Sequence, residues 1–141
     1  MLSPSLGRRF SNGSVTQLGV AHLAAKDEAE ALDGVRRILG YLPQNNVADP
    51  LRTASRDPNE RMVGELDHVV PDDPSRPYDM HDVINGIIDK ETFLEVHKDF
   101  AENIICGFGR LAGRSIGIVA NQPMQMAGVL DIHSSTKAGR F

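Results

Sequence analysis

The segment "IVANQP" (118–123) holds the residues whose types and order have the clearest chemical potential. Asn121, Gln122 and Pro123 directly follow an apolar run of strand-like composition. The two amides carry both hydrogen-bond donors and acceptors, and the proline restricts the backbone. Together they can fix a loop that presents backbone groups to a ligand. A plain turn at the end of a strand is the alternative interpretation.

The histidines and the cysteine favour structural roles. No two of the five histidines are three to five residues apart, the spacing of a local metal-ligand pair, so we expect packing, capping or surface roles at His22, His68, His81, His97 and His133. Cys106 is the only cysteine, which excludes an intrachain disulfide. It lies in an apolar strand pattern, which favours a buried structural thiol over a nucleophile activated by His97.

Charged residues near turns offer weaker signals. Paired aspartates flank prolines and a helix start, where turn formation and capping explain them: Asp72, Asp73, Asp79 and Asp82. Arg110 and Arg114 at a hairpin mouth could hold a phosphate, although a solvated hairpin end is the favoured interpretation. The glycine patterns that bind nucleotides are missing from the sequence.

Composition limits the class of protein. The 141 residues are 40% hydrophobic but only 5% aromatic, which predicts a thin core from one domain or from pieces of two. The formal net charge is −4 and the basic residues are dispersed, so we expect no nucleic-acid partner. No apolar run approaches the roughly 18 residues of a membrane span. Without a secretory signal, we expect a soluble chain in the cytoplasm or an organelle matrix.

The first half of the chain reads as one helix and a connector. No structure is expected for residues 1–19. Apolar residues at helical spacing follow Asp27, and Gly40 and Pro43 supply the stop: Leu32, Val35, Leu39 and Leu42. Residues 43–77 hold six of the eight prolines, which indicates a connector between two packing units. Within it, Met62, Val63 and Leu66 could dock locally.

The second half reads as a helix followed by three strands. Asp79 is the expected N-cap of a helix whose apolar stripe comprises Met80, Val83, Ile84, Ile87 and Ile88. We expect strands at residues 92–96, 103–109 and 115–121, with the last two joined through Ala112 and Gly113. Gly107, Gly109 and Gly117 weaken these strands unless other backbone approaches closely. Ser134 and Ser135 are expected to cap a helix over 137–141, the first turn of a longer one, so the chain should be a piece of a larger protein.

Ordered agreement along most of the chain then points to a family. Residues 17–141 resemble the carboxyltransferase β subunit of biotin-dependent acyl-CoA carboxylases, such as propionyl-CoA carboxylase. The resemblance is carried by "LGVAHLAAKDEAEALDGVRRILGYLPQNN" (18–46), "RDPNERMVGELDHVVPDDPSRPYDMHDVINGIID" (56–89), "FLEVHKDFAENIICGFGRLAGRSIGIVANQP" (93–123) and "GVLDIHSSTKAGRF" (128–141). Because spacing as well as residue type agrees, these stretches are more specific than a short motif.

The resemblance implies an α/β fold, a partial crotonase-like spiral of ββα units. Residues 1–42 would end an N-terminal domain, 43–77 would cross, and 78–141 would start a C-terminal domain. The family transfers a carboxyl group from carboxybiotin, on a carrier domain, to the α-carbon of an acyl-CoA such as propionyl-CoA. Its partners would be further copies of the subunit and a biotin carboxylase and carrier α subunit.

The resemblance also assigns roles within this chain. Backbone amides that stabilise an enolate are the expected catalytic device, and the resemblance places them outside this chain. No catalytic residue is therefore assigned, and the chain alone is expected to be inactive. Asn121 and Gln122 are carried over as neighbours of the cleft where carboxybiotin meets the acyl-CoA. The alternative is a noncatalytic interaction or oligomerisation module that buries its apolar helix stripe against a partner.

Overall fold

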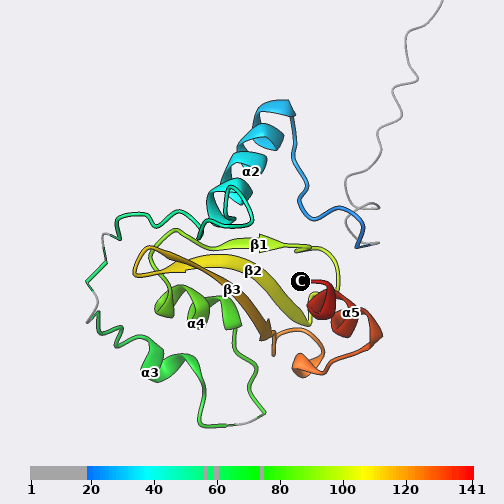
Figure 1. Cartoon of the computed structure of the whole chain (residues 1–141). Helices are drawn as coiled ribbons and strands as arrows, with labels where there is room; N and C mark the ends of the chain where they lie inside the picture. The colour runs from blue at the N-terminus through cyan, green and yellow to red at the C-terminus, as the bar shows by residue number, and fades with distance from the viewer. Residues whose placement is uncertain (1–18, 56, 59–60, 74) are drawn as a thin grey trace, which may run out of the picture.

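The computed structural model describes residues 19–55, 57–58, 61–73 and 75–141. Its elements along the chain are the helices α2 (Glu28–Tyr41), α3 (Leu66–Val69) and α4 (Met80–Ile87), the strands β1 (Leu94–Val96), β2 (Ile104–Leu111) and β3 (Arg114–Asn121), the 3₁₀ turn η1 (Met126–Gly128) and the helix α5 (Ile132–Arg140). The expectation of irregular structure over residues 1–19 falls, except for Gly19, outside the described residues. Figure 1 shows a small sheet with α4 on one side, α5 near its end, and α2 projecting away.

The three strands form one antiparallel sheet in the order β1, β2, β3. Cys106 faces Val96 on one side and Val119 on the other. The predicted reversal is confirmed: Ala112 (φ 50°) and Gly113 (φ 77°) are both left-handed, as a two-residue hairpin turn requires. The carboxylate of Asp89 fixes this turn by accepting the N–H groups of Ala112 (3.0 Å) and Gly113 (2.8 Å).

The face of the sheet under α4 holds the apolar core. Ile84 and Ile88 of the α4 segment pack with Ile105, and all three are buried. Partly buried apolar residues complete this cluster: Met80, Phe93, Ile116, Ile118 and Ala120. The predicted apolar stripe is therefore covered largely by the chain's own sheet, with Ile87 left 57% exposed. Asp79 caps α4 as predicted, accepting the N–H of His81.

The opposite face is covered by the ends of α2 and α5. The rings of Tyr41 and Phe141 lie 5.8 and 5.1 Å from that of Phe108, measured between centroids. The Tyr41 hydroxyl donates to the carbonyl of Thr92. The helix predicted after Asp27 is confirmed, with Asp27 as its N-cap. Its apolar stripe remains about half exposed at Leu32, Val35 and Leu39.

Close backbone approach explains Gly107, as the sequence suggested. A Cβ there would lie 2.6 Å from the Leu94 carbonyl oxygen and 3.0 Å from the Glu95 Cα. Only glycine allows β1 to lie this close to β2.

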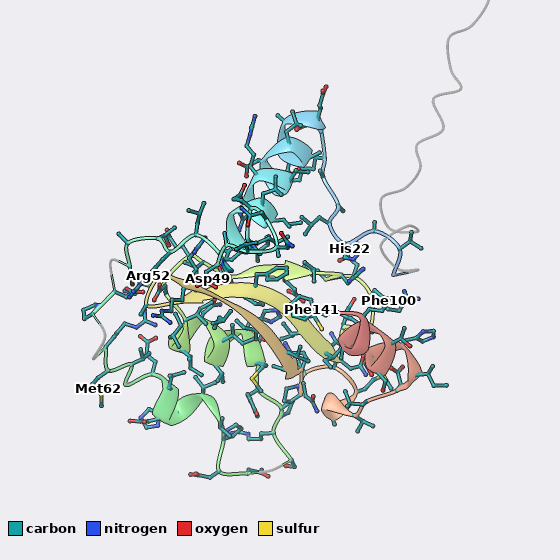
Figure 2. All side chains as sticks on the ribbon, in the orientation of Figure 1. His22, Asp49, Arg52, Met62, Phe100 and Phe141 are labelled. Carbon is teal, nitrogen blue, oxygen red and sulfur yellow. The ribbon has the colours of Figure 1, made fainter. Side chains whose placement is uncertain are left out.

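The proline-rich connector contains α3 and contacts both α4 and the β2–β3 hairpin. Leu66 packs against Gly86 of α4, and the N–H of Thr53 donates to the carbonyl of Gly113 (3.0 Å). The expectation of local docking is thus met by Leu66. It is wrong for Met62, which is 94% exposed and lies at the outer edge of the molecule (Figure 2).

The last helix begins earlier than predicted. Asp131, rather than Ser134 or Ser135, is the N-cap of α5, and Ser134 occupies the third helical position in a capping box. The prediction failed because Asp and Ser are both good N-caps and the sequence did not reveal which one the backbone would use. None of the helices in the described part of the chain is long and apolar enough to cross a membrane.

Candidate functional site

The loop at residues 121–128, which leaves the end of β3, is the candidate site. Three successive residues have left-handed backbone conformations: Met126 (φ 49°), Ala127 (φ 51°) and Gly128 (φ 69°). For the two non-glycine residues this conformation is strained, and such strain persists only where surrounding contacts enforce it. Strain of this kind concentrates at functional sites.

The two predicted amides are adjacent at the start of that loop and hold it in different ways. The Asn121 side-chain N–H donates to the Gly128 carbonyl (2.9 Å), which closes the loop, while the rest of Asn121 is exposed. Gln122 is only 5% exposed. Its backbone N–H donates to the Asn103 carbonyl (2.9 Å), and its side-chain oxygen accepts the N–H of Met124 (3.4 Å). The two neighbours therefore have different roles, one at the surface and one inside.

Gln122 also joins the loop to α4. Its side-chain oxygen accepts the N–H of Met80 (3.1 Å), and its side-chain N–H donates to the Asp79 carboxylate (2.7 Å). A single buried amide thus ties the N-terminus of α4 to the start of the loop. The sequence predicted Asp79 only as the N-cap of α4. It did not predict that Asp79 would also bind Gln122 at the start of the loop.

His81 extends this network to β1, and sequence reasoning missed it. Its Nδ1 lies 2.8 Å from the Asp79 carboxylate and its Nε2 lies 2.9 Å from the Glu95 carboxylate. Burial alone would lower the pKa of His81, but the hydrogen bonds and charges of Glu95 and Asp79 outweigh it and raise the pKa. His81 and Glu95 are 14 residues apart on different elements. No local spacing in the sequence could signal their contact.

The pKa of Asp79 moves in the opposite direction. Burial would raise it, but hydrogen bonds from Gln122 and His81 and the charge of His81 lower it. The Asp79 carboxylate is therefore held in its charged form, as the acceptor of both the amide and the imidazole. The network of Asp79, His81, Glu95 and Gln122 is called the β3-end network below.

Apolar side chains and a hollow surround the loop. Five apolar residues in and just after it are at least half exposed: Met124, Met126, Val129, Leu130 and Ile132. A hollow of about 650 Å³ lies between the loop and α5, bordered by Gln125, Met126, Asn103 and Arg140 among others. A larger hollow of about 690 Å³ lies between α3 and α4 and borders none of the loop. A smaller hollow of about 300 Å³ borders the loop at Pro123 and Ala127, on the side of residues 70–78. The first hollow is thus the larger of these two at the loop.

The two hairpin arginines behave differently from each other, and the expectation of a solvated pair is wrong for Arg110. Its guanidinium is 8% exposed and donates to the carbonyls of Gly40 (2.6 Å), Leu51 (2.9 Å) and Gly113 (3.1 Å). It also lies over the Tyr41 ring, 4.9 Å from the centroid. The sequence suggested exposure because a hairpin mouth is usually solvated, but here α2 and the connector cover it. Arg114 is exposed as predicted.

Cys106 and the histidines give no sign of metal or thiol chemistry. Cys106 is fully buried, as predicted, and burial raises the pKa of its thiol. Within the described residues, no group of three or more His, Cys, Asp or Glu side chains could hold a metal ion. The rings of His22 and His97 have centroids 4.1 Å apart and are tilted by 41°, and the His97 ring lies 6.4 Å from that of Phe100. Figure 2 labels His22 and Phe100.

Known proteins resemble this chain in sequence along most of its length. A model of the carboxyl transferase domain matches residues 13–141. The chain is 56% identical over 123 residues to the carboxyltransferase subunit of propionyl-CoA carboxylase from Haloferax mediterranei, covering 87% of this chain and 24% of that protein. It is 45% identical over 126 residues to the mitochondrial propionyl-CoA carboxylase beta chain of Sus scrofa, covering 89% and 23%.

Solved structures of carboxyl-transferring enzymes match the fold of this chain. The hexameric 12S core of transcarboxylase, with hydrolysed methylmalonyl-CoA bound, matches with a TM-score of 0.88 at 37% identity over 92% of this chain and 26% of that one. A single-chain, multi-domain long-chain acyl-CoA carboxylase matches with a TM-score of 0.74 at 31% identity, covering 90% and 12%. These matches confirm the predicted partial crotonase-like α/β fold.

The chain spans about a quarter of the length of the curated relatives it matches. The domain model, by contrast, covers nearly all of this chain, and the residues it covers include the loop and the β3-end network. The chain therefore belongs to the carboxyl transferase domain family.

Proposed function

We propose that this chain forms part of the carboxyltransferase subunit of a biotin-dependent acyl-CoA carboxylase. In that enzyme a carboxyl group passes from carboxybiotin to the α-carbon of an acyl-CoA such as propionyl-CoA. The observation that carries the proposal is the 56% identity over 123 residues to a propionyl-CoA carboxylase carboxyltransferase subunit. Identity at this level through a proline-rich connector constrains the site as well as the fold.

The loop at residues 121–128 contributes to the cleft in this proposal. Carboxybiotin supplies the carboxyl group, and its ureido ring needs both hydrogen-bonding and apolar contacts. The residues present fit those needs: Asn121 is an exposed amide, and Met124 and Met126 are 55% and 64% exposed beside it. Gln122 is buried, so it supports the loop, and Asn121 is the amide that contacts the ligand.

The remaining organisation follows the family. Residues 1–42 end one carboxyltransferase domain, 43–77 connect, and 78–141 begin the second. The partners are further copies of the subunit and a biotin-carrying subunit, which the hexameric core of the matched transcarboxylase supports. The compartment is the cytoplasm, or the mitochondrial matrix in a eukaryote, where the Sus scrofa relative is named as mitochondrial.

The test uses the intact carboxyltransferase subunit that carries this segment, assembled with its biotin-bearing partner. Transfer of labelled carboxyl to propionyl-CoA should fall about tenfold to a hundredfold in Asn121→Ala, because a lost contact to the reacting partner costs about 1.4 kcal/mol per factor of ten. The matched control is Asn85→Ala, at an exposed position on α4. Equal rates in both variants would contradict the placing of Asn121 at the cleft.

A second candidate is the noncatalytic interaction module, which the sequence suggested through the apolar stripe of α4. The chain's own sheet largely covers that stripe, so the exposed apolar residues of α2 now support this candidate. Leu32, Val35 and Leu39 are 49%, 54% and 52% exposed along one helix, a face that association would cover. Sedimentation of the 141-residue chain at micromolar concentration tests it. The module predicts dimers or larger assemblies that Val35→Glu dissociates, and a monomer at every concentration would exclude it.

A further inference from the structure

The β3-end network contains a titratable group whose two ring nitrogens both face carboxylates. His81 lies between Asp79, at the N-terminus of α4, and Glu95, on β1, at 2.8 and 2.9 Å. A neutral imidazole has one N–H and one lone pair, whereas the imidazolium has two N–H groups. Only the imidazolium can donate to both carboxylates at once.

We propose that His81 is a proton-dependent positioning residue for the loop at residues 121–128. As an imidazolium it bridges Asp79 and Glu95, and the Asp79 carboxylate then holds the side chain of Gln122 from which the loop starts. This inference deepens the proposed function, because it concerns regulation of the same loop.

Loss of the proton changes what Gln122 contacts. With the remaining N–H donating to Glu95, the Nδ1 lone pair faces the Asp79 carboxylate at 2.8 Å, an unfavourable contact of two acceptors. The Gln122 side-chain nitrogen lies 3.2 Å from the same Nδ1 and has two N–H groups, of which one already donates to Asp79. It therefore gains a second acceptor in His81. The proton itself leaves to water, since the His81 side chain is 31% exposed.

A shift of the Gln122 side chain reaches the loop directly. The side-chain oxygen of Gln122 accepts the N–H groups of Met80 and Met124. The backbone carbonyl of Gln122 accepts the N–H of Gln125 (3.0 Å). Gln125 in turn accepts the N–H of Gly128 (2.8 Å), inside the strained left-handed stretch. The start of the strained loop is thus held by Gln122, an amide whose side-chain partners depend on a proton.

Within the described part of the chain, two charged groups act on His81, and both are carboxylates. Asp79 faces it from the start of α4 and Glu95 from β1, while the loop contributes the neutral Gln122. The Phe93 ring meets it edge-on, with centroids 6.1 Å apart. Glu95 also interacts electrostatically with Lys137 of α5 and Cys106 of β2. The two carboxylates raise the pKa of His81, in agreement with the bridging geometry.

The first experiment follows His81 and the loop by NMR in the 141-residue chain between pH 5.5 and 9. Both His81 ring nitrogens should carry protons at the acid end, and the amide resonances of Met124 and Gln125 should shift with the same midpoint as the His81 ring. His68→Gln, at an exposed position on α3, is the control and should leave those shifts unchanged. Loop resonances that do not follow the His81 titration would overturn the proposal.

Two substitutions separate the proton from the side chain. His81→Gln should abolish the pH-dependent loop shift. His81→Lys keeps a cation beside the carboxylates that does not titrate until about pH 10, so the loop resonances should stay near their acid positions throughout. A loop shift that persists in His81→Gln would also overturn the proposal.

The second experiment connects the loop to catalysis in the intact, assembled subunit. The rate of carboxyl transfer, as kcat/KM, should change about tenfold across the His81 titration, within the hundredfold that a 1 Å misplacement can cost. His81→Gln should remove that step from the pH profile. If the loop resonances follow His81 but the rate does not, the result supports His81 as a positioning residue for the loop. The same result contradicts the proposed place of the loop in the cleft.

Discussion

Two histidines on either side of β1 have opposite electrostatic surroundings. His81 lies between two carboxylates, and the pKa of its ring is raised. His97 lies just after β1, is 93% buried, and has its ring centroid 4.1 Å from that of His22. Burial, followed by the charges of His22, Lys137 and Arg140, lowers its pKa. No partner for its Nε2 occurs among the described residues. The same side chain thus has a raised pKa in one region and a lowered pKa in the other.

This difference follows from the charges that lie near each imidazole. The α4 face collects carboxylates around one imidazole. The α5 face collects cations, above all Lys137, whose buried ammonium donates to the carbonyls of Phe100 (2.8 Å), Ala101 (3.3 Å) and Ile104 (2.7 Å). Burial lowers the pKa of Lys137, while the nearby Glu95 acts in the opposite sense. Substitutions in each region can therefore break or sharpen the contrast.

The largest effect is expected at Lys137. Lys137→Met removes the donor that serves three carbonyls, and the free energy of unfolding should fall by about 3 kcal/mol, since each buried acceptor left without a partner costs about 1–3 kcal/mol. It also removes a cation near His97, so the pKa of His97 should rise. Urea denaturation and NMR titration measure the two effects. Lys98→Met, at an exposed position, is the control, and an equal loss there would refute the argument.

A smaller effect is expected at Glu95. Glu95→Gln removes one of the two carboxylates that bracket His81, so the pKa of His81 should fall toward its ordinary value. The free energy of unfolding at pH 6 should drop by about 1.5 kcal/mol, the lower end of the range for a hydrogen bond to a charged group, because the His81 side chain is partly exposed. Denaturation at pH 6 compares it with Glu91→Gln, at an exposed position. An unchanged His81 titration would show that Asp79 alone sets its charge.

Cys106 lies on β2 between the two regions and should matter only through packing. Cys106→Ala removes one buried sulfur, so the free energy of unfolding should fall by about 1 kcal/mol. The titrations of His81 and His97 should remain as they are. A shift of either midpoint beyond the error of the NMR titration would show that the thiol is part of the charge arrangement.

The pH dependence of stability is the smallest effect, because solvent screens the partly exposed His81. A raised folded-state pKa means that the stability from His81 is fully present below its ordinary value near 6.5 and is lost as the pH rises through the raised value. His97 acts in the opposite sense, because its lowered pKa makes stability fall as the pH drops from 6.5 through its folded value. His81→Gln should therefore flatten the alkaline loss and leave the acid loss, as measured by denaturation between pH 5 and 8.5.

Local signals predicted most of the secondary structure. Asp79 was identified as an N-cap, and Ala112 and Gly113 as the hairpin reversal, because caps and two-residue turns depend on neighbouring residues. The start of α5 was misplaced because Asp131 competes with Ser134 for the same role. Arg110 was wrongly expected to be solvated because its burial depends on α2, 70 residues away along the chain at Gly40.

The candidate site was predicted in part. Asn121 and Gln122 stood out as amides at a strand end, but their different exposures could not be read from adjacent positions. His81 was interpreted as one of five isolated histidines. Its partner Glu95 lies on another element, so the two residues meet only because the fold places β1 next to the start of α4.

By itself, the sequence determined the two longer helices before the sheet, its three strands, the cap of α4, the hairpin turn, the buried thiol of Cys106 and the likeness to a carboxyltransferase family, because each depends on residue type and near neighbours. Tertiary structure alone decided which charges meet: His81 with two carboxylates, Arg110 and Lys137 with backbone carbonyls. The physical reason is that electrostatic energy depends on distances of a few ångströms and on burial. Folding sets both, since it joins residues that lie far apart along the chain.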